Sequence, residues 1–135
     1  PREAPGTRAP GAGGADTVGA VAFDGETFAA AGSTGGLVAV LDGRVSDVGL
    51  PGCGLDASDA GAVCVTGAGN DILRARVASR VLRLVEGGEA PRRAAERALA
   101  WLPPGRALGI LVATREEHAA ASRSPFPWAA AEEGR

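Results

Sequence analysis

The chain has 135 residues, of which 45% are hydrophobic and 22% are charged, a composition typical of one globular domain. Its formal net charge of −2 argues against a general nucleic-acid binder. No run of about 18 apolar residues is present, so we expect no membrane span. No signal peptide is visible, and the localisation that we expect is cytoplasmic.

The N-terminal part of the sequence divides into a tail, two strands and a long connection. Residues 1–16 are rich in proline and glycine without apolar periodicity, which predicts a disordered linker or tail. Residues 17–23 (TVGAVAF) and 27–33 (TFAAAGS) predict two strands joined by a hairpin turn at residues 24–26. The glycine-rich stretch at residues 33–61 is longer than an ordinary loop, and loops of that length are usually functional or disordered.

The C-terminal part predicts more strands and two consecutive helices. Strands are expected at residues 62–67 and 107–114, with a further edge strand within residues 118–130. Helices are expected at residues 70–88 and 90–102. Because the helices follow each other directly, the order excludes an alternating βαβ unit. It favours an α+β fold, with a mainly antiparallel sheet and both helices on one face.

The first predicted helix has an apolar stripe at helical spacing, and Asn70 is its expected N-cap. The stripe is made of Leu73, Val77, Val81 and Leu84. The strand at residues 17–23 has little polar alternation, so both of its faces need cover, and this chain supplies helices for one face only.

The cysteines and the histidine give no sign of a metal site. Cys53 and Cys64 fit neither a disulfide scaffold nor a zinc motif and are expected as small buried hydrophobic residues. His118 lies in a polar stretch and is expected in solvent. We therefore expect no metal and no cofactor.

Asp16 and Thr17 stand where the tail meets the first strand. If Thr17 were a chain terminus, its own α-amine, with a pKa of about 7.7–8.0, could accept the proton of the hydroxyl. The tail would then be released by scission between the two residues. Taken alone, the pair is explained more simply by a β-favouring threonine at the start of a strand.

Two further pairs could serve the same chemistry. Arg44 offers a planar fork for a carboxylate and Asp47 an anion for an ammonium, although in isolation they could be an exposed ion pair worth about 0–1 kcal/mol. Thr66 and Gly67 could hold an oxyanion with a hydroxyl and a backbone N–H. The alternatives are a glycine turn or a phosphate cradle, but the third glycine of a dinucleotide fingerprint is replaced here by Ile72.

Four motifs in order, DTVGAVAFD, STGG, GRVSD and TGAGND, resemble the threonine N-terminal-nucleophile hydrolases. The resemblance is to the plant-type L-asparaginase and isoaspartyl-peptidase family, which includes glycosylasparaginase. It covers residues 16–128, nearly all of the family's C-terminal β-subunit. It implies a four-layered αββα sandwich, of which residues 17–135 supply the β-subunit half, and self-cleavage between Asp16 and Thr17.

The resemblance also implies a role for each residue of the four motifs. Thr17 would be the nucleophile, and the second threonine would hydrogen-bond it. The implied catalytic residues are Thr17, Thr34, Thr66 and Gly67, and the implied substrate-binding residues are Arg44, Asp47 and Gly69. The chain departs from the family pattern at Ser46, at the apolar residues 38–40 and at residues 48–49, which bears on pocket shape and substrate choice.

The implied function is an amidohydrolase that acts on the side-chain amide of L-asparagine or on β-aspartyl peptides. Its implied partners are this small-molecule substrate and an α-subunit segment absent from this chain, with αβ units assembled into a homo-oligomer. The alternative is a truncated, catalytically inactive relative that acts as an association or binding module.

Overall fold

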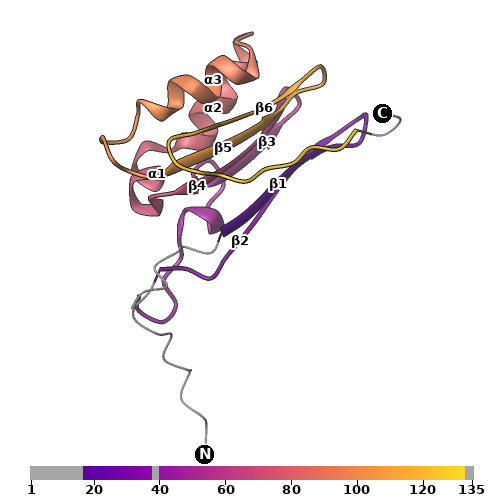
Figure 1. Ribbon diagram of the computed structural model, residues 1–135. Coiled ribbons are helices and arrows are strands. Elements are labelled where there is room, and N and C mark those ends of the chain that lie inside the picture. Colours follow the sequence, from indigo (N-terminus) through magenta and orange to yellow (C-terminus); the bar gives the residue numbers. More distant parts are fainter. Residues whose placement is uncertain (1–16, 38–39, 133–135) are drawn as a thin grey trace, which may run out of the picture.

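The computed structural model describes residues 17–37 and 40–132, so the predicted tail at residues 1–16, with Asp16, lies outside the described residues. The described part is built from antiparallel strand pairs and a layer of helices (Figure 1). This confirms the predicted α+β class.

The first two strands, β1 (Thr17–Phe23) and β2 (Phe28–Thr34), pair antiparallel along their whole length, as predicted. Asp24 closes the turn between them, because its Oδ1 accepts hydrogen bonds from the backbone N–H groups of Thr27 at 2.7 Å and Glu26 at 2.8 Å. These two bonds favour the ionised carboxylate and lower the pKa of Asp24. The turn fixes the register in which the far ends of the two strands face each other.

A second sheet contains four strands in the order β3-β4-β5-β6, and each neighbouring pair is antiparallel. Its strands are β3 (Leu55–Ser58), β4 (Gly61–Gly67), β5 (Leu108–Ala113) and β6 (His118–Ser122). The last three agree with the predicted strands. The prediction missed β3, because it lies inside the glycine-rich stretch and is only four residues long.

Three helices cover one face of this sheet (Figure 1). They are α1 (Gly69–Ala75), α2 (Val77–Glu86) and α3 (Pro91–Leu99), and a short 3-10 turn, η1 (Asp47–Gly49), precedes β3. Pro91 opens α3 at its first turn, where the missing N–H costs nothing.

The single helix predicted at residues 70–88 is wrong, because Arg76 interrupts it. Its backbone has φ 49° and ψ 54°, a left-handed conformation that costs a non-glycine residue about 1–2 kcal/mol. The break separates α1 from α2 so that Ile72 and Val77 are both fully buried. Asn70 is not the N-cap, since Ala68 holds that position and Asn70 lies in the first turn of α1.

The hydrophobic core lies between the helices and the four-stranded sheet. From the sheet it takes alternate residues of β4 and β5, as expected for side chains that share one face. From the helices it takes the apolar face of α2 and the alanines of α3, whose small size brings that helix close to the sheet. The core residues at 1% exposure or less include Val63, Val65, Ile110, Val112, Val81, Ala94 and Ala98.

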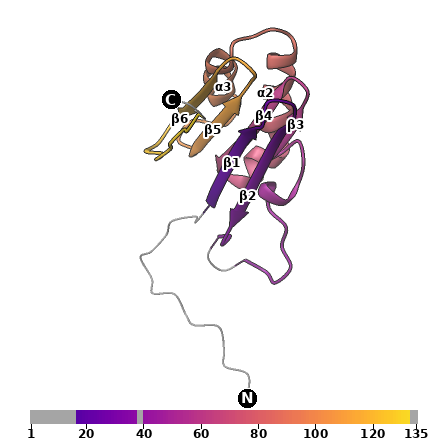
Figure 2. The same cartoon turned by 90° about the vertical axis from the view of Figure 1, so that its right-hand side faces the viewer.

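The β1–β2 hairpin lies against the opposite face of the four-stranded sheet and makes a third layer (Figure 2). Cys64 of β4 points into this interface, where its Sγ lies 3.5 Å from the carbonyl oxygen of Ala31. Gly19 of β1 faces the same sulfur so closely that a Cβ there would lie 2.2 Å from it. The two cysteines are buried and unpaired, as predicted.

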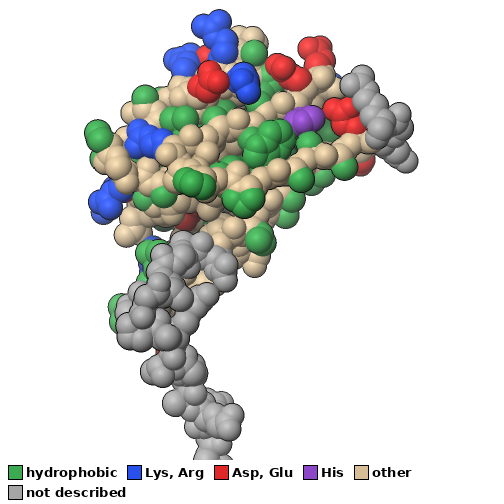
Figure 3. All heavy atoms as spheres, viewed as in Figure 1, with side chains coloured by type: hydrophobic (Ala, Val, Ile, Leu, Met, Phe, Trp, Pro, Cys, Tyr) green, Lys and Arg blue, Asp and Glu red, His purple; other side chains and the backbone are tan. Residues whose placement is uncertain are grey.

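The outward face of the hairpin is apolar and exposed. Val18 is 71% exposed, and its outward neighbours along β1, Ala20 and Ala22, are exposed as well. Figure 3 shows hydrophobic side chains along the edge where the sheet and the hairpin are stacked, whereas charged side chains of both signs lie over the helices. The described residues thus form three layers, and they do not show the fourth layer of the αββα sandwich. No helix among them has the length or apolar character that a bilayer crossing requires.

Candidate functional site

Two threonine hydroxyls meet at the open end of the hairpin. Thr17 and Thr34 are directly paired across β1 and β2, and Thr17 Oγ1 donates a hydrogen bond to Thr34 Oγ1 at 3.1 Å. Thr34 Oγ1 also accepts a bond from the backbone N–H of Gly36 at 3.0 Å. Because both threonines are half-buried and β-branched, their hydroxyls are held in one orientation.

A small recess of about 20 Å³ opens beside this hydroxyl pair. Five of the residues predicted for the site line it, so the fold collects them from all four motifs. The lining residues are Thr17, Thr34, Gly36, Leu37, Ser46, Asp47, Gly67 and Gly69.

Asp47 is the charged group of this recess and is only 4% exposed. Ser46 Oγ donates to its Oδ1 at 2.6 Å, and the backbone oxygen of Asp47 accepts a bond from the N–H of Gly54 at 3.0 Å. Gly69 packs directly against the carboxylate, because a Cβ at that position would lie 2.4 Å from Oδ1. The absence of a side chain at residue 69 therefore lets helix α1 begin against the carboxylate.

Gly67 ends β4 and turns the chain into α1 next to the recess. Its φ of 139° is a conformation that favours glycine, and a Cβ there would lie 2.1 Å from the carbonyl oxygen of Ala107. The backbone N–H of Ala68 bonds to that same oxygen at 2.9 Å. The glycine is thus required by the backbone, which is a structural reason for its presence beside any chemical one.

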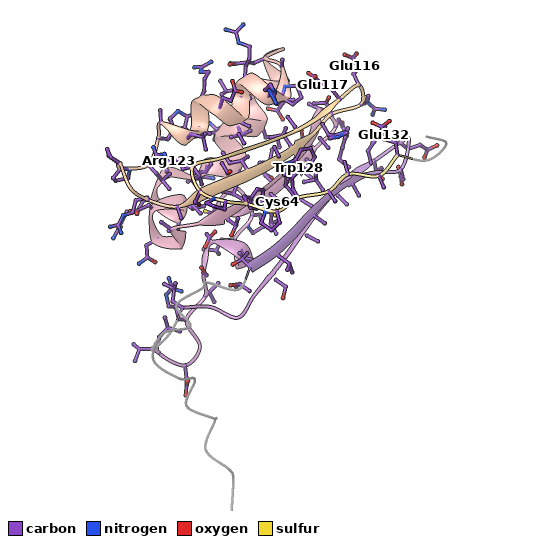
Figure 4. The ribbon with its side chains drawn as sticks, in the orientation of Figure 1. Cys64, Glu116, Glu117, Arg123, Trp128 and Glu132 are labelled. Carbon is purple, nitrogen blue, oxygen red and sulfur yellow. The ribbon has the colours of Figure 1, made fainter. Side chains whose placement is uncertain are left out.

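Thr66 points to a different space. It lines a second pocket of about 290 Å³ together with Thr17, so Thr17 stands at the junction of the two spaces. The walls of this pocket are mostly apolar, and Figure 4 places the labelled Cys64 and Trp128 between the four-stranded sheet and the hairpin. The structure therefore brings Thr66 near Thr17, but not into the recess that contains Asp47.

Arg44 does not line either space. Its guanidinium Nη2 donates to Oδ1 of Asn70 in the first turn of α1, at 2.7 Å. Since Gly69 contacts Asp47, the same turn of α1 touches both Arg44 and Asp47, the charged residues predicted to bind the substrate. Sequence reasoning missed Asn70, which looked like a helix cap, and gave Ser46 no role beyond a departure from the family pattern.

Cys64 also belongs to the surroundings of Thr17. Burial raises the pKa of its thiol, and the nearby carboxylate of Asp47 acts in the same direction. The sulfur is therefore neutral and packs as a hydrophobic side chain. The part of the chain that the structure describes contains no group of three histidine, cysteine or acidic residues placed to hold a metal ion.

Comparisons with known proteins find a matching family and several relatives. The family model described as asparaginase matches residues 3–131. The chain is 38% identical over 125 residues to an isoaspartyl peptidase/L-asparaginase of Danio rerio, which covers 88% of this chain and 40% of that protein. It is 43% identical over 90 residues to a plant-type L-asparaginase of Pyrobaculum calidifontis, covering 65% of this chain and 30% of that protein.

A third similarity, 38% identity over 86 residues, is to an N(4)-(beta-N-acetylglucosaminyl)-L-asparaginase of Rattus norvegicus. It covers 62% of this chain and 25% of that protein. The chain thus spans at most about 40% of the length of these three curated relatives.

Proposed function

The chain belongs to the asparaginase family, and from that premise we propose that it carries the nucleophile of an amidohydrolase acting on L-asparagine or β-aspartyl peptides. The observation that carries the proposal is the hydrogen bond between Thr17 and Thr34 at the rim of a recess that contains a buried carboxylate.

The nucleophile would be produced by scission of the chain itself. Thr17 Oγ attacks the carbonyl carbon of Asp16, the peptide nitrogen leaves that carbon, and an ester replaces the amide. The departing nitrogen takes up the hydroxyl proton and becomes the free α-amine of Thr17. Water then hydrolyses the ester, which releases the carboxyl group of Asp16 and restores the Thr17 hydroxyl. An α-amine with a pKa of about 7.7–8.0 is partly neutral near pH 7–8 and can accept the hydroxyl proton.

Substrate would bind with its α-ammonium group at the recess and its α-carboxylate towards Arg44, which lies outside the recess. Asp47 suits the α-ammonium, because its carboxylate is fixed by Ser46, and Arg44 suits the α-carboxylate. The buried position of Asp47 strengthens this attraction relative to water. Gly69 gives the head group access by leaving the start of α1 without a side chain.

The reaction would proceed in two steps. Thr17 Oγ attacks the side-chain amide carbon, and the developing oxyanion accepts hydrogen bonds from the Thr66 hydroxyl and the Gly67 N–H. One such donor typically lowers the barrier by roughly 2.7–4 kcal/mol. Ammonia or an amine leaves with the proton held by the α-amine, and water then hydrolyses the acyl-enzyme and restores Thr17.

The remaining part of the sandwich would come from an α-subunit segment outside this chain. Two observations support this partner: the relatives are more than twice as long, and the outward face of the hairpin is apolar. Homo-oligomers of such αβ units are the assembly we propose. The alternative of an inactive association module is not favoured, because the relatives that the chain matches are named as asparaginases and isoaspartyl peptidases.

The test uses the full-length product of the gene that encodes this chain. Intact-mass measurement is expected to find a fragment that begins at Thr17, and ammonia release from L-asparagine should disappear in Thr17→Ala. Thr27→Ala, at the other end of the same hairpin, is the matched control and should retain turnover. Full activity in Thr17→Ala, or no cleavage before residue 17 in an active preparation, would contradict the mechanism.

A further inference from the structure

Arg44 is held by a side chain that the proposed chemistry does not use. It follows Gly43, which has a φ of 80°, and its backbone N–H bonds to the carbonyl oxygen of Leu41 at 3.2 Å. These contacts shape the loop but do not aim the guanidinium. The bond from Nη2 to Asn70 Oδ1, at 2.7 Å, is what directs the end of the side chain towards α1.

The turn of α1 that carries Asn70 is firmly placed. Ile72 is fully buried in the core, and Asp71 Oδ2 lies 3.0 Å from Nε of Arg106, in the connection before β5. The backbone N–H of Ala68 is bonded to Ala107 in the same connection. Helix α1 is therefore fixed by the core, and the hydrogen bond from Arg44 to Asn70 ties the guanidinium on the long loop to this fixed helix.

The chemistry of an amide suits this task. A guanidinium only donates hydrogen bonds, so it must meet the oxygen of the Asn70 amide. That oxygen orients Nη2 without bringing a negative charge, so the full positive charge of Arg44 and its other N–H donors stay available to a substrate carboxylate. A carboxylate at residue 70 would hold the guanidinium more strongly and would compete with the substrate for it.

We propose that Asn70 is a positioning residue that aims Arg44 at the α-carboxylate of the substrate while adding no negative charge of its own. The inference rests on the proposed function, since it assigns the substrate carboxylate to Arg44. It also explains why one turn of α1 contacts both the residue assigned to the α-ammonium group of the substrate and the residue assigned to its α-carboxylate. Gly69 lets the turn pack against Asp47, and Asn70 holds Arg44.

The experiment measures kcat and KM for two amides in the full-length gene product. L-asparagine has the α-carboxylate, and L-asparaginamide has a neutral carboxamide in its place. Asn70→Asp is expected to raise KM for L-asparagine about tenfold or more, because a charged competitor replaces a neutral one, and Asn70→Ala somewhat less. Neither variant should change KM for L-asparaginamide more than about twofold, and kcat should stay within about twofold for both substrates.

Asp71→Asn is the matched control, because it weakens one contact of the same turn without touching Arg44, while the burial of Ile72 and the bond from Ala68 to Ala107 still hold the turn in place. It should lower Tm and leave the ratio of the two KM values unchanged. An unchanged KM for L-asparagine in both Asn70 variants would overturn the inference, and so would an equal rise for the two substrates. A wild-type protein that releases no ammonia from either amide would instead overturn the proposed function, and the inference with it.

Discussion

The hydroxyl of Thr34 has two partners, and its removal is expected to affect chemistry more than folding. In Thr34→Val the bond from Thr17 Oγ1 and the bond from Gly36 N–H are both lost, while a β-branched side chain of similar size remains in the strand. A hydrogen bond contributes about 0.5–1.5 kcal/mol, so we expect kcat to fall roughly tenfold.

Steady-state ammonia release and thermal unfolding check this expectation together. Thr34→Ser keeps the hydroxyl and should retain most of the turnover. Thr27→Val, which loses the bond from Thr27 Oγ1 to Asp24 at the opposite end of the hairpin, controls for a general loosening of β1 and β2. Undiminished kcat in Thr34→Val would remove this threonine from the site.

Cys64 predicts a pH dependence of stability. Burial raises the pKa of its thiol above the ordinary value of 9.0, so the folded chain keeps this proton at a pH where the unfolded chain loses it. The free energy of unfolding should therefore be unaffected by this group below about pH 8.5 and fall as the pH rises through and above 9, by at most about 1.4 kcal/mol per pH unit.

Urea unfolding between pH 7 and 10 measures this slope. In Cys64→Ala the part of the slope due to this thiol should vanish. Cys53→Ala, which removes the other buried cysteine, should keep it. Equal slopes in the wild type and in Cys64→Ala would show that this thiol does not titrate differently on folding.

At the scale of secondary-structure elements, the sequence predicts what local patterns determine. The apolar runs and the turn around Asp24 predict the hairpin, and Pro91 marks the start of α3. The break at Arg76 has no local signal, because arginine is a good helix former and the left-handed backbone follows from tertiary packing of Ile72 and Val77. The four-residue β3 is likewise specified by its pairing with β4 and not by its own sequence.

The site shows the same division between local and tertiary information. The order of the motifs predicts which residues meet, and Thr17, Thr34 and Asp47 do line one recess. Sequence could not show that Arg44 turns away to Asn70, because that contact joins residues 26 positions apart on a loop and a helix. Nor could it show that Thr66 faces a second pocket, which depends on how the hairpin lies on the sheet.

Because the hairpin packs closely on the four-stranded sheet at Gly19 and Cys64, we expect substitutions at these two residues to have coupled effects on stability. Gly19→Ala would place a Cβ 2.2 Å from Cys64 Sγ, so the sulfur or the layers must shift, at an expected cost of about 1–3 kcal/mol in the free energy of unfolding. In Gly19→Ala/Cys64→Ala the sulfur is gone, and the new methyl lies 3.5 Å from the Cβ of residue 64 and 3.6 Å from the carbonyl oxygen of Ala31, both ordinary contact distances.

A double-mutant cycle by denaturant unfolding checks this prediction. The double variant should be more stable than the sum of the two single effects implies, by an interaction free energy of about 0.5–3 kcal/mol. Gly19→Ala/Cys53→Ala is the control and should show additive effects, because Cys53 donates to the carbonyl oxygen of Leu73 and does not contact the hairpin. Additivity in both cycles would mean that the close approach of Gly19 to Cys64 does not control the spacing of the layers.

At the scale of the whole molecule, the described residues cover both faces of the four-stranded sheet but only the inner face of the hairpin. The outer face of the hairpin is exposed to solvent. The helices shield the four-stranded sheet, and that sheet shields the inner face of the hairpin (Figure 2). The outer face carries small apolar side chains, which allow another layer to approach closely. The proposed nucleophile, Thr17, lies at the end of this hairpin. A partner layer that covers the outer face of the hairpin would therefore also lie next to the proposed site.

The bare face predicts how the 135-residue chain behaves when it is produced alone. A contiguous apolar surface drives association, so sedimentation velocity over a concentration series should find oligomers that grow with concentration. Val18→Thr keeps a β-favouring residue at the most exposed apolar position of β1 and should shift the distribution towards monomer. Leu41→Ser, at an even more exposed leucine in the loop before Arg44, should shift it less if the hairpin face is the contact. A monodisperse monomer at every concentration would show that the hairpin does not need a partner layer.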